Sequence, residues 1–196
     1  LAHFFNFNNG HAYDIYVDID EPTTFTNILE HLSKTVLATN QLSIVEDIAK
    51  MWELSFWTSL MGEIIKKPEY ENNNKIEEYL TYIGVNDNKG AQVVRVIFQT
   101  LAKLLSDKAE KVVELIFKVQ EILNSKEFED AKNEVLNILN NGCKAVIVID
   151  TLELYQIRKF EMQQALGAML HTVTKFSFGR IHKNLHVKCF LPGEIL

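Results

Sequence analysis

The stretch at residues 142–155 reads GCKAVIVIDTLELY and decides the fold that this sequence predicts. Its residues 145–149 are an uninterrupted, mostly β-branched apolar run, which is typical of a strand. A strand without a polar face needs cover on both sides, as in a parallel sheet between two layers of helices. The run ends in Asp150, and Glu153 follows three residues later. Carboxylates at the carboxyl end of such a strand lie where open α/β sheets bind ligands.

The same run also fits a core strand whose first polar residues simply mark its exit into solvent. Short apolar runs that end in Asp are common, so this stretch alone does not establish a binding site.

Composition places limits on the class of protein. The chain has 196 residues, 47% of them hydrophobic and 23% charged, which is typical of one soluble globular domain with or without an insertion. A net charge of −6 argues against a nucleic-acid-binding surface, which would be basic. Cys143 and Cys189 form neither a disulfide framework nor a zinc-binding spacing, so we expect structural thiols and a cytoplasmic location.

The apolar segments and the start of the chain argue against a membrane-spanning or secreted protein. No apolar run reaches the ~18 residues that cross a bilayer, and the start of the chain does not read as a secretory signal. The chain begins with Leu1, and both ends fall inside apparent structure. We therefore expect it to be a fragment of a longer protein.

Two further strands are predicted from alternating side chains. Residues 12–20 read AYDIYVDID, in which Tyr13, Ile15, Val17 and Ile19 are expected on one face, so this strand is half exposed and suits a sheet edge. Residues 185–191 alternate in the same way. Strands separated by helices predict parallel β-α-β units with right-handed crossovers.

Helices are predicted between these strands. A capping box at Ser43 and Glu46 begins a long helix that is apolar around much of its circumference, so we expect it to be buried. Residues 70–141 are predicted to contain at least three amphipathic helices and no strand. Another long helix is predicted over residues 157–177, where Gly167 would let a neighbouring element approach closely.

This order of elements resembles the P-loop ATPases of the AAA+ and STAND type. Residues 1–9 look like the end of the helix after the phosphate loop, and AYDIYVDID looks like the edge strand. AVIVIDTLE resembles the Walker B strand, and LHVKCFLPGEIL resembles the sensor strand, a pairing found in bacterial proteins of this kind. The resemblance covers residues 1–20 and 143–196 and leaves out the helices between them.

The resemblance implies roles for a few residues. Asp150 would organise Mg²⁺, and Glu153 would be the catalytic residue that activates water for ATP hydrolysis. Glu194 and His186 would be the possible sensor residues near the end of the last strand. No G-x-x-x-x-G-K-[ST] occurs in the chain, so either the phosphate loop lies upstream of Leu1 or the chain is a degenerate relative that binds no nucleotide.

We therefore expect an α/β fold, a three-layer parallel sheet of P-loop NTPase type with a large helical insertion. Residues 1–69 would form the first part of the ATPase-like core, residues 70–141 the insertion, and residues 142–196 the Walker B-like strand, a helix and the sensor-like strand. The expected function is part of an ATP-binding and hydrolysing regulatory domain with Mg²⁺ as cofactor. The alternatives are a non-catalytic interaction module and a doubly wound small-molecule-binding domain without hydrolysis.

The sequence also leads to expectations about partners and metal ligands. A protein partner or self-association would use the helical block, while membrane and nucleic acid are not expected. The six histidines show no metal-ligand spacing. Asp14, Asp18 and Asp20 would either gather a cation on one strand face or, as is more common, form a solvated face that protects the sheet edge.

Overall fold

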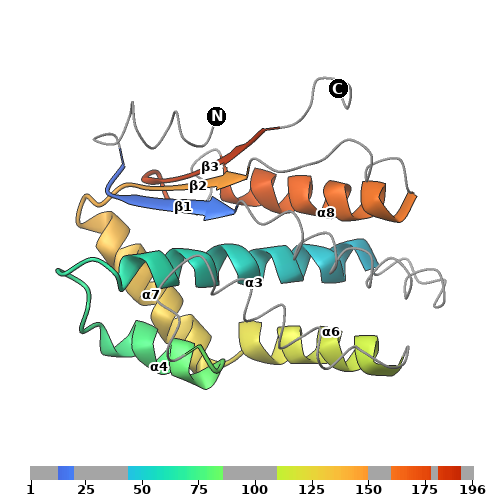
Figure 1. Cartoon of the computed structure of the whole chain (residues 1–196), viewed down its shortest axis with the longest axis horizontal. Helices are drawn as coiled ribbons and strands as arrows, with labels where there is room; N and C mark the ends of the chain where they lie inside the picture. The colour runs from blue at the N-terminus through green and yellow to red at the C-terminus, as the bar shows by residue number, and fades with distance from the viewer. Residues whose placement is uncertain (1–12, 20–43, 86–109, 150–159, 178–180, 191–196) are drawn as a thin grey trace.

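The computed structural model describes residues 13–19, 44–85, 110–149, 160–177 and 181–190 (Figure 1). These ranges contain a three-stranded parallel sheet and five helices, in the chain order β1, α3, α4, α6, α7, β2, α8, β3. The predicted α/β class is therefore confirmed. The ends of the chain and the capping residue Ser43 lie outside the described residues.

The sheet has the strand order β1-β2-β3, with β1 at Ile15–Ile19, β2 at Ala145–Ile149 and β3 at Leu185–Cys189. Both pairs are parallel, and Ala145 lies level with Ile15 on one side and Leu185 on the other. All five residues of β2 are buried, whereas exposure alternates along β1. The prediction of a buried central strand between two parallel neighbours is confirmed.

The two faces of the sheet have different surroundings. The face that carries Val17 and Ile147 belongs to the main hydrophobic core. The opposite face carries Val146 and Val148, and the described hydrophobic side chains that pack against them are those of Tyr13, Tyr16 and Phe190. The sheet is thus buried at its centre on both sides, as its continuous apolar strand requires.

The two helices that contact the sheet, α3 (Ile44–Ile64) and α8 (Phe160–Phe176), pack on each other and on the same face of the sheet. Their placement follows from the strand order. Helix α3 lies in the connection from β1 to β2 and α8 in the connection from β2 to β3, and two right-handed connections that advance in the same direction place their helices on the same face of the sheet. A helix layer on the second face, as a three-layer fold requires, would have to come from outside the described residues. The third layer therefore stays a prediction.

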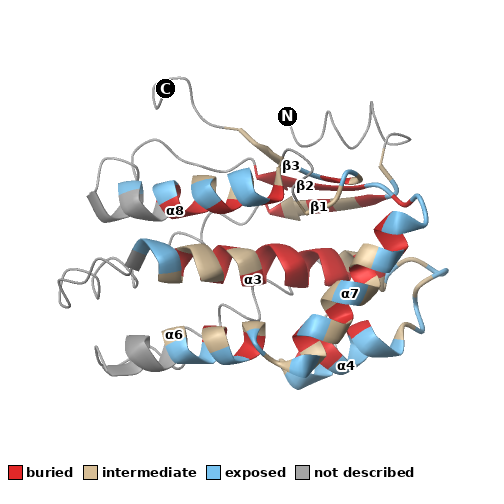
Figure 2. Ribbon diagram, turned by 180° about the vertical axis from the view of Figure 1, so that it is seen from behind, coloured by how far each residue is buried: buried red, intermediate tan, exposed pale blue. Residues whose placement is uncertain are grey.

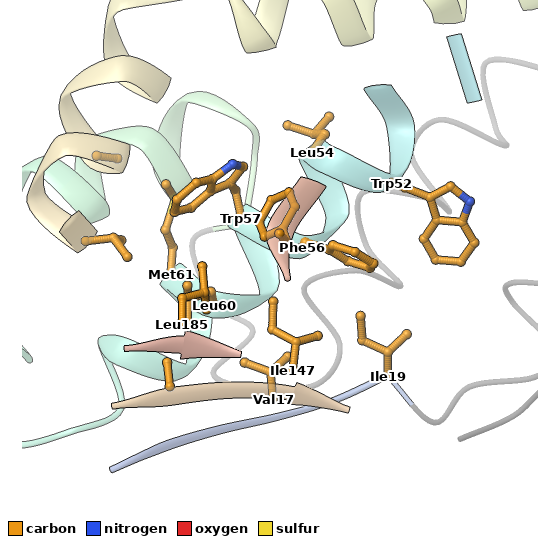
Figure 3. Packing of buried hydrophobic residues seen from close by; sticks show 14 of the residues in the cluster. Val17, Ile19, Trp52, Leu54, Phe56, Trp57, Leu60, Met61, Ile147 and Leu185 are labelled. Carbon is orange, nitrogen blue, oxygen red and sulfur yellow. The ribbon is translucent and has the colours of Figure 1, made fainter. Parts of the chain in front are cut away.

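Helix α3 is the centre of the core (Figure 3). Every residue from Leu54 to Gly62 is buried, and nine consecutive residues cover all sides of a helix. The ring of Phe56 meets that of Phe176 on α8 edge-on, with centroids 5.3 Å apart. As the sequence predicts, this helix is buried around most of its circumference, since it separates the sheet from an outer helical layer (Figure 1).

That outer layer contains α4 (Asn74–Tyr82) and α6 (Glu110–Leu123), and α7 (Lys126–Asn140) runs diagonally from it to the amino edge of the sheet (Figure 1). Helix α4 packs mainly against α7, and all three helices contact α3. Exposed residues cover their outer faces (Figure 2). Three helices are therefore confirmed within residues 70–141, and the described part of that range contains no strand. Their status as an insertion into a P-loop core stays a prediction.

Local capping chemistry sets the helix ends. Asn73 accepts a hydrogen bond from the Ile76 N–H and so begins α4 earlier than its apolar stripe suggests. At the other end Gly84 has φ +80, and the N–H groups of Gly84 and Val85 donate to the carbonyl oxygens of Thr81 and Leu80. This is a Schellman motif, which needs a residue with positive φ.

Two expectations are wrong. Tyr13 packs against Val146 and Val148 rather than with Ile15, because the chain bends at Asp14 before the strand begins. There the N–H groups of Asp14 and Ile15 both donate to the Lys144 carbonyl oxygen, at 2.9 and 3.1 Å, which interrupts the alternation. Gly167 lies on an exposed face of α8, and no atom lies within 4 Å of the position its Cβ would occupy.

Candidate functional site

The candidate site lies at the carboxyl end of β2. The strand ends at the buried Ile149, which lies level with Ile19 on β1 and Cys189 on β3. The N–H of Phe190 donates to the Ile149 carbonyl oxygen at 2.9 Å, so the β2–β3 ladder continues to the edge of the sheet. The strand that leads to Asp150 is therefore held on both sides up to its final residue.

The described residues at this edge are apolar. Burial raises the pKa of the Cys189 thiol to about 11, so the thiol stays protonated at neutral pH. Neither Ile19 nor Ile149 carries a polar side chain, so metal or phosphate chemistry here depends on the residues that follow the strands. Asp150, Glu153 and Glu194 are those residues, and all of them lie outside the described ranges.

His186 is the one candidate that the structure describes. It is the second residue of β3, is exposed, and lies level with Val146 on the central strand. Val146 precedes Asp150 by four residues, a separation of about 13 Å at the rise of a parallel strand. The ring of His186 packs edge-on against Tyr13, with centroids 5.6 Å apart. This position does not suit contact with a phosphate at the carboxyl edge, so the sensor role would fall to Glu194.

Asp14 and Asp18, the two described aspartates in and just before β1, lie too far apart to share a cation. Asp14 precedes the strand and its Oδ2 accepts the Lys144 N–H at 2.8 Å, which ties β1 to the start of β2. Asp18 lies four residues further on, about 13 Å along the strand. Asp20 is outside the described residues. Within the ranges that the structure describes, no three His, Cys, Asp or Glu side chains lie close enough together to hold a metal ion.

The amino edge of the sheet is occupied by structural contacts. Asn184 Nδ2 donates to the Leu139 carbonyl oxygen at 2.8 Å, and the Asn184 N–H donates to His182 Nδ1 at 3.1 Å. His182 Nε2 lies 2.9 Å from Asn140 Oδ1. These bonds join the end of α7 to the turn before β3. Sequence reasoning missed this cluster, whose only sequence signal is a polar turn before a strand.

Cys143 belongs to the same edge. Burial and the neighbouring Asp14 carboxylate raise the pKa of its thiol, and burial likewise raises the pKa of the nearby Tyr70 phenol. A thiol with a raised pKa carries little thiolate at neutral pH, which favours a structural role. The described residues of the amino edge thus make structural contacts that hold the fold together.

Comparisons of the chain with protein-family models, with curated proteins and with solved structures found no match. None of the helices within the described ranges is both long enough and apolar enough to cross a membrane.

Proposed function

We propose that this chain is part of an ATP-binding and hydrolysing regulatory domain of a P-loop ATPase. The observation that carries the proposal is the position of β2, which is central, parallel to both neighbours and buried at all five residues, and which ends directly before Asp150. The order β1, β2, β3 along the chain also matches the order of edge, Walker B and sensor strands in the resemblance.

The chemistry of the proposed site follows from two carboxylates. Asp150 follows a strand that is fixed on both sides, and a fixed carboxylate oxygen is the ligand type that Mg²⁺ prefers. Glu153 comes three residues later and would orient the attacking water without binding the metal. In hydrolysis the water oxygen bonds to the terminal phosphorus as the bond to the bridging oxygen breaks, and the products are ADP and phosphate.

The sheet also indicates where the rest of the site would lie. The described strands all advance in one direction with their helices on one face, so no reversal of winding occurs among them. Open α/β sheets bind ligands at the point where the winding reverses. A further strand beside β1 or β3 would create that point and would supply the phosphate loop that these 196 residues lack.

The test is phosphate release by the full-length natural protein with Mg²⁺ and ATP. Glu153→Gln should lower turnover by roughly two to four decades, because a water-positioning group is lost. The matched control is Glu129→Gln, which makes the same change on the exposed surface of α7. Loss of turnover in neither variant, or equal loss in both, would contradict the role of Glu153.

A second candidate is a non-catalytic interaction module on a degenerate nucleotide-binding fold. It is favoured by the two aromatic side chains that the outer helical layer exposes, Tyr82 on α4 and Phe117 on α6. A full-length protein that neither binds nor hydrolyses nucleotide would favour this candidate over the first.

A further inference from the structure

The outer layer carries a hollow on the solvent side of α4. It encloses about 600 Å³ and is lined by Asn74, Glu77, Glu78, Thr81, Tyr82 and Glu127. Five of these residues belong to α4, and Glu127 comes from the first turn of α7. We call this feature the α4 hollow. It is open to solvent. Helix α4 lies in the layer furthest from the sheet, so a macromolecular partner can reach the hollow (Figures 1 and 2).

The carboxylates of the α4 hollow differ from their neighbours in their ion pairing. Glu134 on α7 pairs with Lys75 at 3.3 Å, and Glu121 on α6 pairs with Lys118 at 2.8 Å. Glu77, Glu78 and Glu127 form no ion pair with any described lysine, arginine or histidine. Among the described residues, the α4 hollow therefore gathers three carboxylates without an ion-pair partner, and a cationic ligand would be complementary to it.

An aromatic surface continues from one side of the α4 hollow. Tyr82 lines the hollow with 41% of its surface exposed, and its hydroxyl group lies 3.5 Å from Glu121 Oε1 on α6. Phe117 precedes Glu121 by one helical turn, so the two share a face of α6, and Phe117 is 65% exposed. Aromatic side chains are enriched at protein interaction surfaces.

We propose that the α4 hollow and Phe117 form a docking surface for a basic amphipathic segment of a partner protein. Lysine or arginine side chains of that segment enter the hollow and meet Glu77, Glu78 and Glu127. Its apolar side chains cover Tyr82 and Phe117. This proposal is independent of nucleotide chemistry, because the surface lies in the outer layer and the candidate site lies at the sheet edge.

Two other occupants fit the surface less well. A divalent cation needs several carboxylates around one point, and no such group of three exists among the described residues. A second copy that docks through the same face would oppose like charges across a two-fold axis. The chain also carries a net charge of −6, which disfavours self-association of its acidic faces.

The test uses the full-length protein and fluorescently labelled, helix-forming synthetic peptides, with binding followed by anisotropy at low salt. One peptide combines Lys with Leu at helical spacing, a second replaces each Lys by Glu, and a third replaces each Leu by Ser. Only the first should bind tightly, and added salt should weaken its binding. Equal binding of the first and third peptides would show non-specific charge attraction and would overturn the proposal.

Variants then locate the surface. The triple substitution of Glu77, Glu78 and Glu127 by Gln should weaken binding about tenfold, the combined effect of three exposed ion pairs. Phe117→Ser should weaken it several-fold through lost apolar contact. The matched control replaces Glu46, Glu69 and Glu129 by Gln. All three are exposed and lie outside the α4 hollow, and Glu46 and Glu129 are in the first turns of α3 and α7.

An equal loss of binding in the control triple variant would overturn the proposal. Concentration-dependent sedimentation of the protein alone, abolished by Phe117→Ser, would also overturn it by identifying a second copy as the occupant. All variants lie on the surface, so unchanged circular dichroism and thermal midpoints should accompany the binding losses.

Discussion

The hydroxyl groups of Tyr79 on α4 and Thr58 on α3 lie 2.6 Å apart inside the hydrophobic core. Both residues are completely buried, and the Tyr79 ring also packs edge-on against Phe128 of α7. A hydrogen bond in such a dry environment is strong, and its loss leaves a buried polar group without a partner. This pair therefore fixes the outer helical layer to the helix that covers the sheet.

Tyr79→Phe should lower the free energy of unfolding by about 1–3 kcal/mol, because Thr58 Oγ1 loses its tyrosine partner in the core. Adding Thr58→Val should lower it by less than the sum of the two single changes. Urea denaturation measures both. Tyr82→Phe is the control, because the hydroxyl group of Tyr82 is exposed. A loss of unfolding free energy in Tyr82→Phe as large as that in Tyr79→Phe would contradict the stabilising role of the buried hydrogen bond.

Alkaline pH should destabilise the fold through Tyr79. Burial raises the pKa of Tyr79 well above its ordinary value, so the folded state keeps a proton that the unfolded chain releases above about pH 10. Because the folded state then binds more protons, the free energy of unfolding falls as pH rises, by up to about 1.4 kcal/mol per pH unit. Tyr79→Phe should reduce this slope above about pH 10; an unchanged slope would contradict the burial of an un-ionised phenol.

Gly84→Ala should destabilise the protein by about 1 kcal/mol or more, since φ is +80 at the end of α4 and alanine is strained there. Gly167→Ala makes the same substitution and should have the opposite effect on stability. It should stabilise by up to about 1 kcal/mol, because Gly167 is helical and a Cβ would meet nothing within 4 Å. Thermal unfolding of both variants should show midpoints that move in opposite directions.

Ile147→Ala should lower the free energy of unfolding by about 2–5 kcal/mol, because Ile147 is completely buried at the centre of the sheet. Ile181→Ala makes the same chemical change at a half-buried position that packs on the same core, and it should have a clearly smaller effect. Equal losses in chemical denaturation would contradict the central position of β2.

Much of the fold could be predicted from short-range pattern. The continuous run at residues 145–149 predicts a strand buried on both faces, and the alternation over residues 12–20 predicts a half-exposed strand at a sheet edge. The first prediction is confirmed, and within the described sheet β1 lies at an edge with alternating exposure from Ile15 to Ile19, because each pattern depends on how many faces of a strand are covered. The departure of Tyr13 depends on a bend at Asp14, which arises from backbone hydrogen bonds to Lys144 and leaves no mark in the alternation.

The candidate site could be predicted only in part. An apolar strand that ends in Asp150 indicates which edge of the sheet would carry ligand chemistry. The alternating pattern also predicts that His186 lies on a strand. It does not predict the pairing of His186 with Val146, which places His186 away from the carboxyl edge of the sheet. The unpaired carboxylates of the α4 hollow depend on the packing of α4 against α7, which joins positions far apart in the sequence.

The nucleotide site is tested by calorimetric titration of Mg²⁺ and ATP into the full-length natural protein, with Asp150→Ala compared with Asp130→Ala at a half-buried position of α7. We predict binding that depends on Mg²⁺, is strongly weakened by Asp150→Ala, and is unchanged by Asp130→Ala. Glu153→Gln should retain this binding, since that residue orients water rather than metal. The absence of any binding heat, or equal binding by the Asp150 and Asp130 variants, would contradict the proposal of a nucleotide site at the end of β2.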